Sequence, residues 1–104
     1  MFRTVLVASI LTISLGAPAF AQSTDAAKEA ECRKQGQIAT NIMTERKNGS
    51  NTRRAERRVI RALPDDAKSY EVAVPALVEW IYSMPDEQMG PAVSNALYQT
   101  CISQ

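Results

Sequence analysis

The residues with the clearest chemical potential are five arginines in the run Arg53-Arg54-Ala55-Glu56-Arg57-Arg58-Val59-Ile60-Arg61. On a helix, Arg54, Arg58 and Arg61 align, and Arg53 and Arg57 lie alongside, because residues three and four apart are neighbours. Guanidinium groups at this spacing repel one another unless an anionic group is near, and they bind carboxylate and phosphate in a bidentate manner. The run therefore predicts either a solvated helix face or a binding site for an anionic partner.

The distribution of charge along the chain bears on what neutralises these arginines. Residues 22–61 carry 10 basic and 5 acidic residues, whereas residues 62–104 carry 1 basic and 6 acidic residues. The acidic half can neutralise the arginines within the fold, or between copies in a self-associated form. The alternatives are an unknown acidic protein, anionic lipid headgroups or lipopolysaccharide phosphates. We expect no nucleic-acid partner, because no aromatic residue is interleaved with the arginines.

Residues typical of catalysis and metal binding are scarce. The chain has no histidine, the commonest general base and metal ligand. Paired carboxylates occur at Asp65-Asp66 and Asp86-Glu87, but each pair follows a proline at an expected helix start, where negative charge stabilises the helix dipole. We therefore expect no catalytic residues, no metal site, no cofactor and no enzymatic activity.

The first 21 residues read as a signal peptide. Arg3 provides a positive start, Val5–Leu15 is mostly apolar, and Ala19 and Ala21 form the small-x-small pattern that a signal peptidase cleaves. The apolar stretch is shorter than the roughly 20 residues of a membrane-spanning helix, although a retained membrane anchor is the alternative. Cleavage near Ala21 leaves one domain, residues 22–104, without a transmembrane segment. The pattern is typical of bacteria and predicts a periplasmic protein, or one released to the medium.

Export also bears on the two cysteines, Cys32 and Cys101. Disulfides persist outside the cytoplasm, and two cysteines permit one intramolecular pairing. The bond would close most of the domain into one loop, for which chain-entropy arguments give about 4 kcal/mol of stabilisation. We expect a structural Cys32–Cys101 disulfide. An intermolecular bond and a thiol redox site are the alternatives, although the Cys-x-x-Cys motif typical of redox sites is absent.

Two helices are expected in the first half of the domain. The first runs from about Asp25 to Lys47, with N-cap oxygens at Ser23 and Thr24 and a stop at Asn48-Gly49. Its apolar residues at helical spacing are Cys32, Gly36, Ile38, Ala39, Ile42 and Met43. The second begins at a cap provided by Ser50, Asn51 or Thr52 and ends at Leu63, before Pro64. Its apolar face consists of Ala55, Val59, Ala62 and Leu63.

Two further helical stretches are expected in the second half. The third runs from about Ala67 to Ser83 after a cap at Asp65-Asp66, and Pro75 either kinks it or restarts it as a first-turn proline. Its segment Val72–Tyr82 carries one charge, which is typical of a helix at the centre of a fold, or of an exposed helix that binds a partner. The last helix begins between Glu87 and Pro91 and ends near Ile102. Its inner stripe consists of Val93, Ala96, Leu97 and Cys101.

No segment shows the alternating pattern of a strand. We therefore expect an all-α fold, a small bundle of three to four short helices in which a disulfide joins the first and last helices.

Several scattered positions together resemble a known group of proteins. They are Cys32, Ile38-Ala39-x-x-Ile42-Met43, Arg46-x-x-Gly49, Ile81-Tyr82-x-x-Pro85 and Cys101. In this respect the chain resembles the small, uncharacterised, secreted single-disulfide helical proteins of proteobacteria and their phages. The resemblance implies a helical fold with the cysteines joined, and it implies no activity. Pro75 and the Arg-rich second helix depart from that pattern.

These observations favour a non-enzymatic periplasmic interaction protein, an inhibitor or an immunity-type binder with a charge-segregated helical surface. One alternative is a small acid- or envelope-stress chaperone, since protonation of the eleven carboxylates at low pH would leave a repulsive positive charge. Without histidine, however, such a protein has no side chain that ordinarily titrates between about pH 5 and 8. Another alternative is binding to the anionic envelope through the Arg-rich helix.

Overall fold

A computed structural model describes residues 19–104, with side chains from Asp25 onward. The charged and apolar parts of the expected signal peptide lie outside these residues. Within the described range the chain forms four α-helices and two 3₁₀ helices and no strand, which confirms the predicted all-α bundle. The elements are α1 (Ala19–Lys47), α2 (Thr52–Ala62), η1 (Asp65–Ala73), α3 (Val74–Ser83), η2 (Asp86–Gln88) and α4 (Pro91–Ile102).

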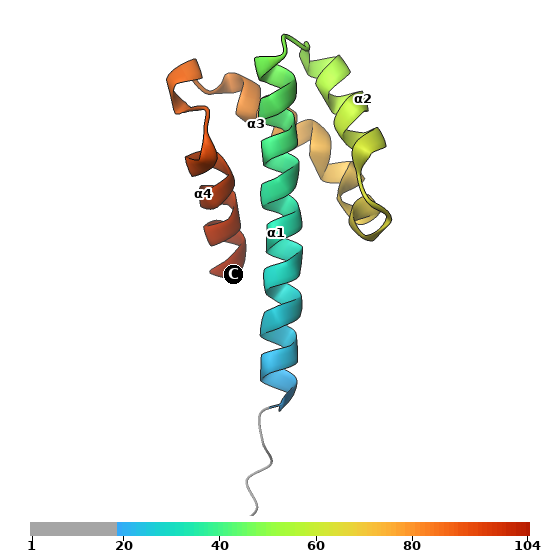
Figure 1. Cartoon of the computed structure of the whole chain (residues 1–104), viewed down its shortest axis with the longest axis vertical. Helices are drawn as coiled ribbons and strands as arrows, with labels where there is room; N and C mark the ends of the chain where they lie inside the picture. Colours follow the sequence, from blue (N-terminus) through green and yellow to red (C-terminus); the bar gives the residue numbers. More distant parts are fainter. Residues whose placement is uncertain (1–18) are drawn as a thin grey trace, which may run out of the picture.

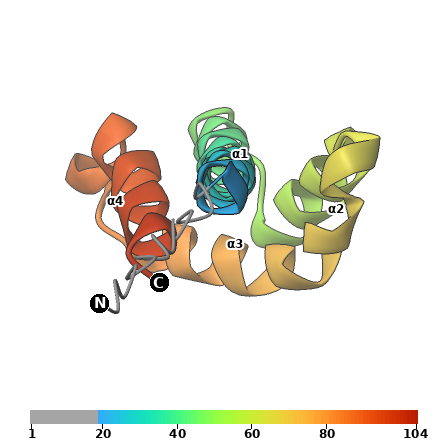
Figure 2. The ribbon, with the colours of Figure 1, turned by 90° about the horizontal axis from the view of Figure 1, so that it is seen from below.

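The long helix α1 is the element on which the others are assembled (Figure 1). It contacts α2, α3 and α4. Helices α2 and α4 lie on opposite sides of α1, and α3 passes beneath it from the α2 side towards the α4 side (Figure 2). The arrangement therefore leaves α2 and α4 well separated from each other.

The core lies where α1, α2 and α3 meet. Its buried residues are Ile38, Ala39, Ile42, Ala55, Val59, Leu63, Ala67, Val74, Val78, Ile81 and Val93. Helix α1 contributes the predicted stripe, in which Cys32 and Gly36 are also buried. Two predicted core positions are wrong, because Ala62 and Ala96 are exposed. Leu63 is the buried residue at the end of α2, and Ala96 borders an open cleft beside α3.

The end of α1 is a complete Schellman motif at the predicted stop. Gly49 has a positive φ of 85°. Its N–H donates to Arg46 O (3.0 Å), and the Ser50 N–H donates to Glu45 O (3.0 Å). These two bonds satisfy carbonyls that the helix end leaves without partners. Helix α2 begins at Thr52, directly after this turn. Asn51 is its N-cap, and Asn51 Oδ1 accepts a hydrogen bond from Arg54 N (2.9 Å).

Two predicted helix starts are wrong. Helix α1 begins at Ala19 rather than near Asp25, so the chain is already helical at Ser23 and Thr24. The alanines on both sides of these residues are strong helix formers and extend the helix through them. The predicted cap at Asp65-Asp66 is also absent. Both residues lie inside the first turn of η1, which begins after Pro64 without a side-chain cap hydrogen bond.

Pro75 divides the third helical stretch instead of kinking it. An α-helix continuing from η1 would need a hydrogen bond from the Pro75 nitrogen to Glu71 O, and proline has no N–H. The Val74 N–H donates to that carbonyl instead, in the tighter 3₁₀ pattern. Helix α3 then starts with Pro75 in its first turn, where the missing N–H is not needed.

The disulfide is formed between Cys32 on α1 and Cys101 on α4, as predicted. The two Cα atoms are 5.5 Å apart, and Cys32 is fully buried. Helix α4 also packs along α1: Val93 is buried, Leu97 and Tyr98 are half-buried, and Ser94 O and Tyr98 Cβ lie next to Gly36. Ser94 Oγ lies 2.7 Å from Thr40 Oγ1, and Lys28 Nζ donates to Gln104 O (2.6 Å). The disulfide therefore reinforces a contact that packing and hydrogen bonds also make.

A polar cluster attaches η1 to α1. Glu31 accepts hydrogen bonds from Tyr70 Oη (2.6 Å) and from Lys34 Nζ (2.8 Å). Lys34 also donates to Asp66 O (3.0 Å). The bond from Lys34, followed by the bond from Tyr70, holds the pKa of Glu31 below its usual value. Desolvation, and then the bond to Glu31, raises the pKa of Tyr70.

Among the helices that the structure describes, none combines the length and the apolar character needed to span a membrane.

Removal of the disulfide is expected to destabilise the protein by about 4 kcal/mol, because the cross-link restricts the unfolded chain over a long loop. The change is Cys32→Ala together with Cys101→Ala, measured by urea unfolding against the oxidised protein. Reduction of the unaltered protein provides a second measurement that leaves the side-chain volume in place. An unchanged unfolding midpoint in both cases would contradict a stabilising role.

The Glu31 cluster is expected to make stability depend on pH at both extremes. A carboxyl group whose pKa is lowered in the fold stabilises the protein at pH values above its ordinary pKa. This contribution is lost as the pH falls from about 5 towards 2. The raised pKa of Tyr70, and that of Lys34, which its bond to Glu31 raises, give a contribution that is lost above about pH 10.

Tyr70→Phe tests this through the thermal midpoint as a function of pH. We expect a lower midpoint than the unaltered protein at neutral pH and a smaller further loss on acidification. Tyr98→Phe is the matched control, since the Tyr98 hydroxyl makes no hydrogen bond among the described side chains. Acid curves that differ between Tyr70→Phe and the unaltered protein only by a constant offset would exclude the coupling.

Candidate anion-binding site

All five predicted arginines lie on the exposed side of α2. Arg53, Arg54, Arg57, Arg58 and Arg61 are each exposed. The opposite side of the helix is buried through Ala55 and Val59, which pack in the core. The structure therefore brings the predicted residues together on one face, as the helical spacing indicated.

Arg58 differs from the other four because it has an acidic partner. Its Nη1 lies 3.7 Å from Glu45 Oε2, and the Glu45 side chain is only 17% exposed. The same oxygen accepts a hydrogen bond from Ser50 Oγ (2.6 Å). Ser50 is itself buried, and its carbonyl accepts from Tyr82 Oη (2.6 Å). Arg58 thus belongs to the network that holds the α1–α2 turn over α3.

The remaining four arginines form what we call the α2 arginine face: Arg53, Arg54, Arg57 and Arg61. Among the side chains that the structure describes, none of the four is in an ion pair, whereas Arg58 is. They share one side of three helical turns, so their charges add at close range. An anionic group placed over this face would relieve their mutual repulsion.

The acidic half of the chain does not neutralise this face within the fold. Two ion pairs join the halves, Lys34 with Asp66 (3.6 Å) and Arg46 with Asp86 (2.6 Å), and both basic residues belong to α1. The one ion pair of α2 uses Glu45, which lies in the basic half. Among the described side chains, no residue of the acidic half therefore forms an ion pair with an arginine of α2.

Arg46 is an important residue whose position the sequence did not reveal. It lies in the last turn of α1, where a basic side chain ordinarily interacts with the C-terminal end of its own helix. Instead its Nη1 donates to Ile81 O (2.5 Å) near the end of α3, and its Nη2 donates to Asp86 Oδ1 (2.6 Å). The guanidinium carbon also lies 5.9 Å from the ring centroid of Tyr82. One side chain of α1 thus positions the end of α3 and the start of η2.

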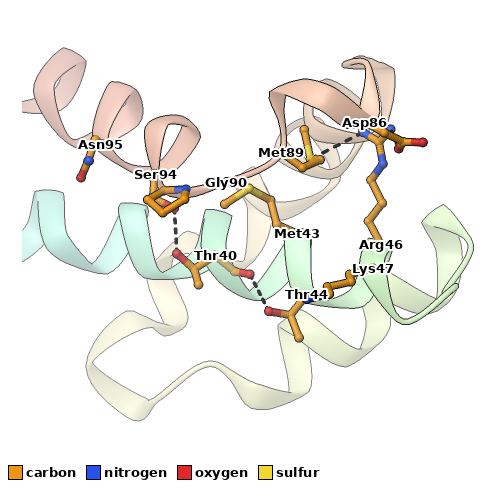
Figure 3. Close-up of a pocket in the computed structure, with 11 residues that line it drawn as sticks. Thr40, Met43, Thr44, Arg46, Lys47, Asp86, Met89, Gly90, Ser94 and Asn95 are labelled. Atoms are coloured by element: carbon orange, nitrogen blue, oxygen red, sulfur yellow. Dashed lines mark hydrogen bonds and ion pairs between the residues drawn. The ribbon is translucent and has the colours of Figure 1, made fainter.

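A groove lies beside Arg46, between α1, η2 and the start of α4 (Figure 3). Its volume is about 720 Å³. The lining residues are Thr40, Met43, Thr44, Arg46, Lys47, Asp86, Met89, Gly90, Pro91, Ser94 and Asn95. Several of its polar groups are already paired: Arg46 with Asp86, Thr40 with Ser94, and Thr44 with Thr40 O (3.0 Å). It holds none of the α2 arginines.

The groove and the α2 arginine face lie on different sides of the molecule. Helix α4 and η2 border the groove on one side of α1, whereas α2 occupies the other side (Figures 1 and 2). Within the described residues, no group of three or more acidic or cysteine side chains is placed to hold a metal ion. The α2 arginine face is therefore the candidate site that the charges support best.

No protein-family model, no curated protein and no solved structure matches this chain. The resemblance to small secreted single-disulfide proteins accordingly stays a prediction.

Arg46 and its acidic partner are expected to differ sharply in their effect on stability. Arg46→Met keeps an apolar stem but removes the charged donor to Ile81 O, which retains only the longer bond from Met84 N (3.3 Å), and a hydrogen bond from a charged group contributes about 2 kcal/mol. Asp86 is 91% exposed, so Asp86→Asn should cost less than about 1 kcal/mol. Urea unfolding of the two oxidised variants measures this difference. Equal losses would mean that the ion pair, and not the carbonyl contact, holds α3.

Proposed function

We propose that the mature chain, residues 22–104, is a non-enzymatic periplasmic interaction protein whose α2 arginine face binds an acidic protein surface. The observation that carries this proposal is the set of four exposed arginines without an ion pair among the described side chains, beside a fifth that is paired. Arginine suits such a role because its planar group binds carboxylates in a bidentate manner and is always charged. An inhibitor or an immunity-type binder would act through this kind of contact.

The packing of α2 favours a protein partner over insertion into a membrane surface. An amphipathic helix that enters a lipid interface needs a free apolar face beside its basic one. Ala55 and Val59 of α2 are buried in the core, as is Leu63 beyond its end, and Ile60 packs partly against the core, which leaves the small Ala62 as the exposed apolar residue of the helix. The large exposed apolar side chains of the described residues are Val72 and Trp80, and neither belongs to α2. Contact of α2 with a lipid surface would therefore depend on charge alone.

The anchoring of α2 also supports a binding role. Asn51 caps the helix, the Glu45–Ser50–Arg58 network fixes its start, and Leu63 secures its end. The backbone under the arginines is thus fixed before a partner arrives. A pre-organised surface loses less entropy on binding than a flexible one, which leaves more of the interaction energy for affinity.

Charge-neutral variants of α2 test the proposal. The first variant combines Arg53→Gln, Arg57→Gln and Arg61→Gln. The matched control combines Arg33→Gln, Lys47→Gln and Lys68→Gln, which removes the same charge from exposed residues outside α2. Immobilised oxidised protein is exposed to a periplasmic extract at low salt, and retained proteins are identified by mass spectrometry.

We expect a specific acidic protein that the unaltered chain and the control retain, and that the α2 variant binds about tenfold more weakly or worse. Binding should weaken near 1 M salt, where the Debye length falls to about 3 Å. Equal losses in the two variants, or no specific partner at any salt concentration, would refute the proposal. Binding to phosphatidylglycerol vesicles without a protein partner would point to the envelope instead. A dimer that dissociates with salt in light scattering would assign the arginines to self-association.

A further inference from the structure

An apolar cleft lies between α3 and α4, away from the α2 arginine face. It has a volume of about 310 Å³ and is lined by Ala76, Leu77, Trp80, Ala96, Leu97 and Thr100. We call it the α3–α4 cleft. The disulfide holds α4 against α1, and α3 and α4 provide the two walls of the cleft. Its walls carry no charged side chain.

Two residues of the cleft wall, Ala76 and Trp80, are exposed on α3, and the exposed Val72 precedes them in η1. We call these three residues the apolar stripe. Val72 is 88% exposed, and Trp80 is 42% exposed. The opposite face of α3 is buried through Val74, Val78 and Ile81. Helix α3 is therefore apolar on two faces, and only one of them is buried in the core. This explains why its sequence is compatible with both a central helix and a partner-binding helix.

The charge around the stripe has a single sign. No lysine or arginine occurs after Lys68, so η1 beyond that residue, α3 and α4 contribute no positive side chain. Glu71 precedes Val72, and Glu79 lies three residues after Ala76 at the margin of the stripe. Both carboxylates are exposed, and neither is in an ion pair among the described side chains. A partner that covered this apolar surface would meet negative charge at its edge.

We propose that the α3–α4 cleft and the adjoining stripe bind an amphipathic helix of another protein, with apolar side chains in the cleft and lysines or arginines facing Glu71 and Glu79. This is the groove mode of helix recognition, in which apolar anchors at helical spacing enter a hydrophobic groove. Tryptophan is enriched among the residues that dominate binding energy at such contacts. The proposal does not depend on the α2 arginine face, which selects for charge of the opposite sign.

The cleft itself argues against two other occupants. Its volume is at the lower limit of pockets that enclose small molecules, which suits one or two side chains better than a whole ligand. A second copy would have to present its basic helix, α2, to the acidic margin. Ala55 and Val59 of α2 are buried, Ile60 packs partly against the core and the exposed Ala62 is small, so α2 has no large apolar anchor free to enter the cleft.

Trp80 gives a direct test, because it is the one tryptophan of the chain. The probe is a synthetic helical peptide without tryptophan, with leucines on one face and lysines on the other. We expect its titration to shift the Trp80 emission to shorter wavelength, as the indole leaves water. A peptide with glutamates in place of the lysines, and one with serines in place of the leucines, should each bind at least about tenfold more weakly.

Two variants of the full oxidised domain locate the contact. Ala76→Glu with Ala96→Glu fills the cleft at exposed positions. It should weaken binding of the leucine–lysine peptide at least about tenfold, although it adds negative charge. Glu71→Gln with Glu79→Gln should weaken it about threefold. Asp65→Asn with Glu87→Gln is the control for net charge, since both residues are exposed and outside the cleft, and it should leave binding unchanged. Circular dichroism verifies that each variant folds.

Three outcomes would overturn the proposal. Binding that survives Ala76→Glu with Ala96→Glu would show general electrostatic attraction of the peptide. Equal binding of the lysine and glutamate peptides would remove the role of Glu71 and Glu79. A blue shift of Trp80 that grows with the concentration of the protein alone would identify a second copy as the occupant.

Discussion

The bond between Cys32 and Cys101 determines where α4 can lie, and the surfaces of the molecule follow from that. Helix α4 buries Val93, packs Leu97 against the core and approaches α1 closely at Gly36, with polar contacts to Thr40 and Lys28. A helix of this length is marginal by itself, so its position depends on these contacts together with the cross-link. A domain this small also has little core to spare for a fourth helix. Because Cys32 lies on α1, the cross-link places α4 against α1 and not against α3, and the α3–α4 cleft stays open.

The two surfaces of the molecule have opposite chemistry for reasons that lie in the packing. Helix α2 buries Ala55 and Val59 and turns its arginines outward. Helix α3, which passes beneath α1, buries Val74, Val78 and Ile81 and still presents Trp80, near two carboxylates that are in no ion pair among the described side chains. The near balance of the whole-chain charge conceals this separation. Under the two proposals, one surface would select for anionic groups, and the other for apolar groups with a basic margin.

Much of the fold could be predicted because the residues at each helix end determine where the helix stops. Asn48-Gly49 and Pro64 end helices through a positive φ and a missing N–H, and two cysteines permit one intramolecular bond. The position of Arg46 could not be predicted. Its bond to Ile81 O depends on how α3 crosses α1, and no spacing along the chain encodes that angle. Ala62 and Ala96 were misplaced for a similar reason, since helical periodicity marks an apolar side but not whether a neighbour covers it. The arginines could be assigned to one face, but the pairing that separates Arg58 from the rest depends on Glu45, in another helix.

That separation bears on how the α2 arginine face would bind. Glu45 is largely buried and also accepts from Ser50, so its ion pair with Arg58 is part of the fold and would persist in a complex. The other four arginines keep their side-chain freedom and their hydration until a partner arrives. Each must then lose rotamer entropy, which reduces the net contribution of a single exposed pair to well below its Coulomb energy. A partner must therefore engage several of them at once, with carboxylates spaced to match one side of three helical turns. That requirement favours a structured acidic surface over a diffuse anionic one, and it gives a small, charge-balanced domain a means of selecting its partner.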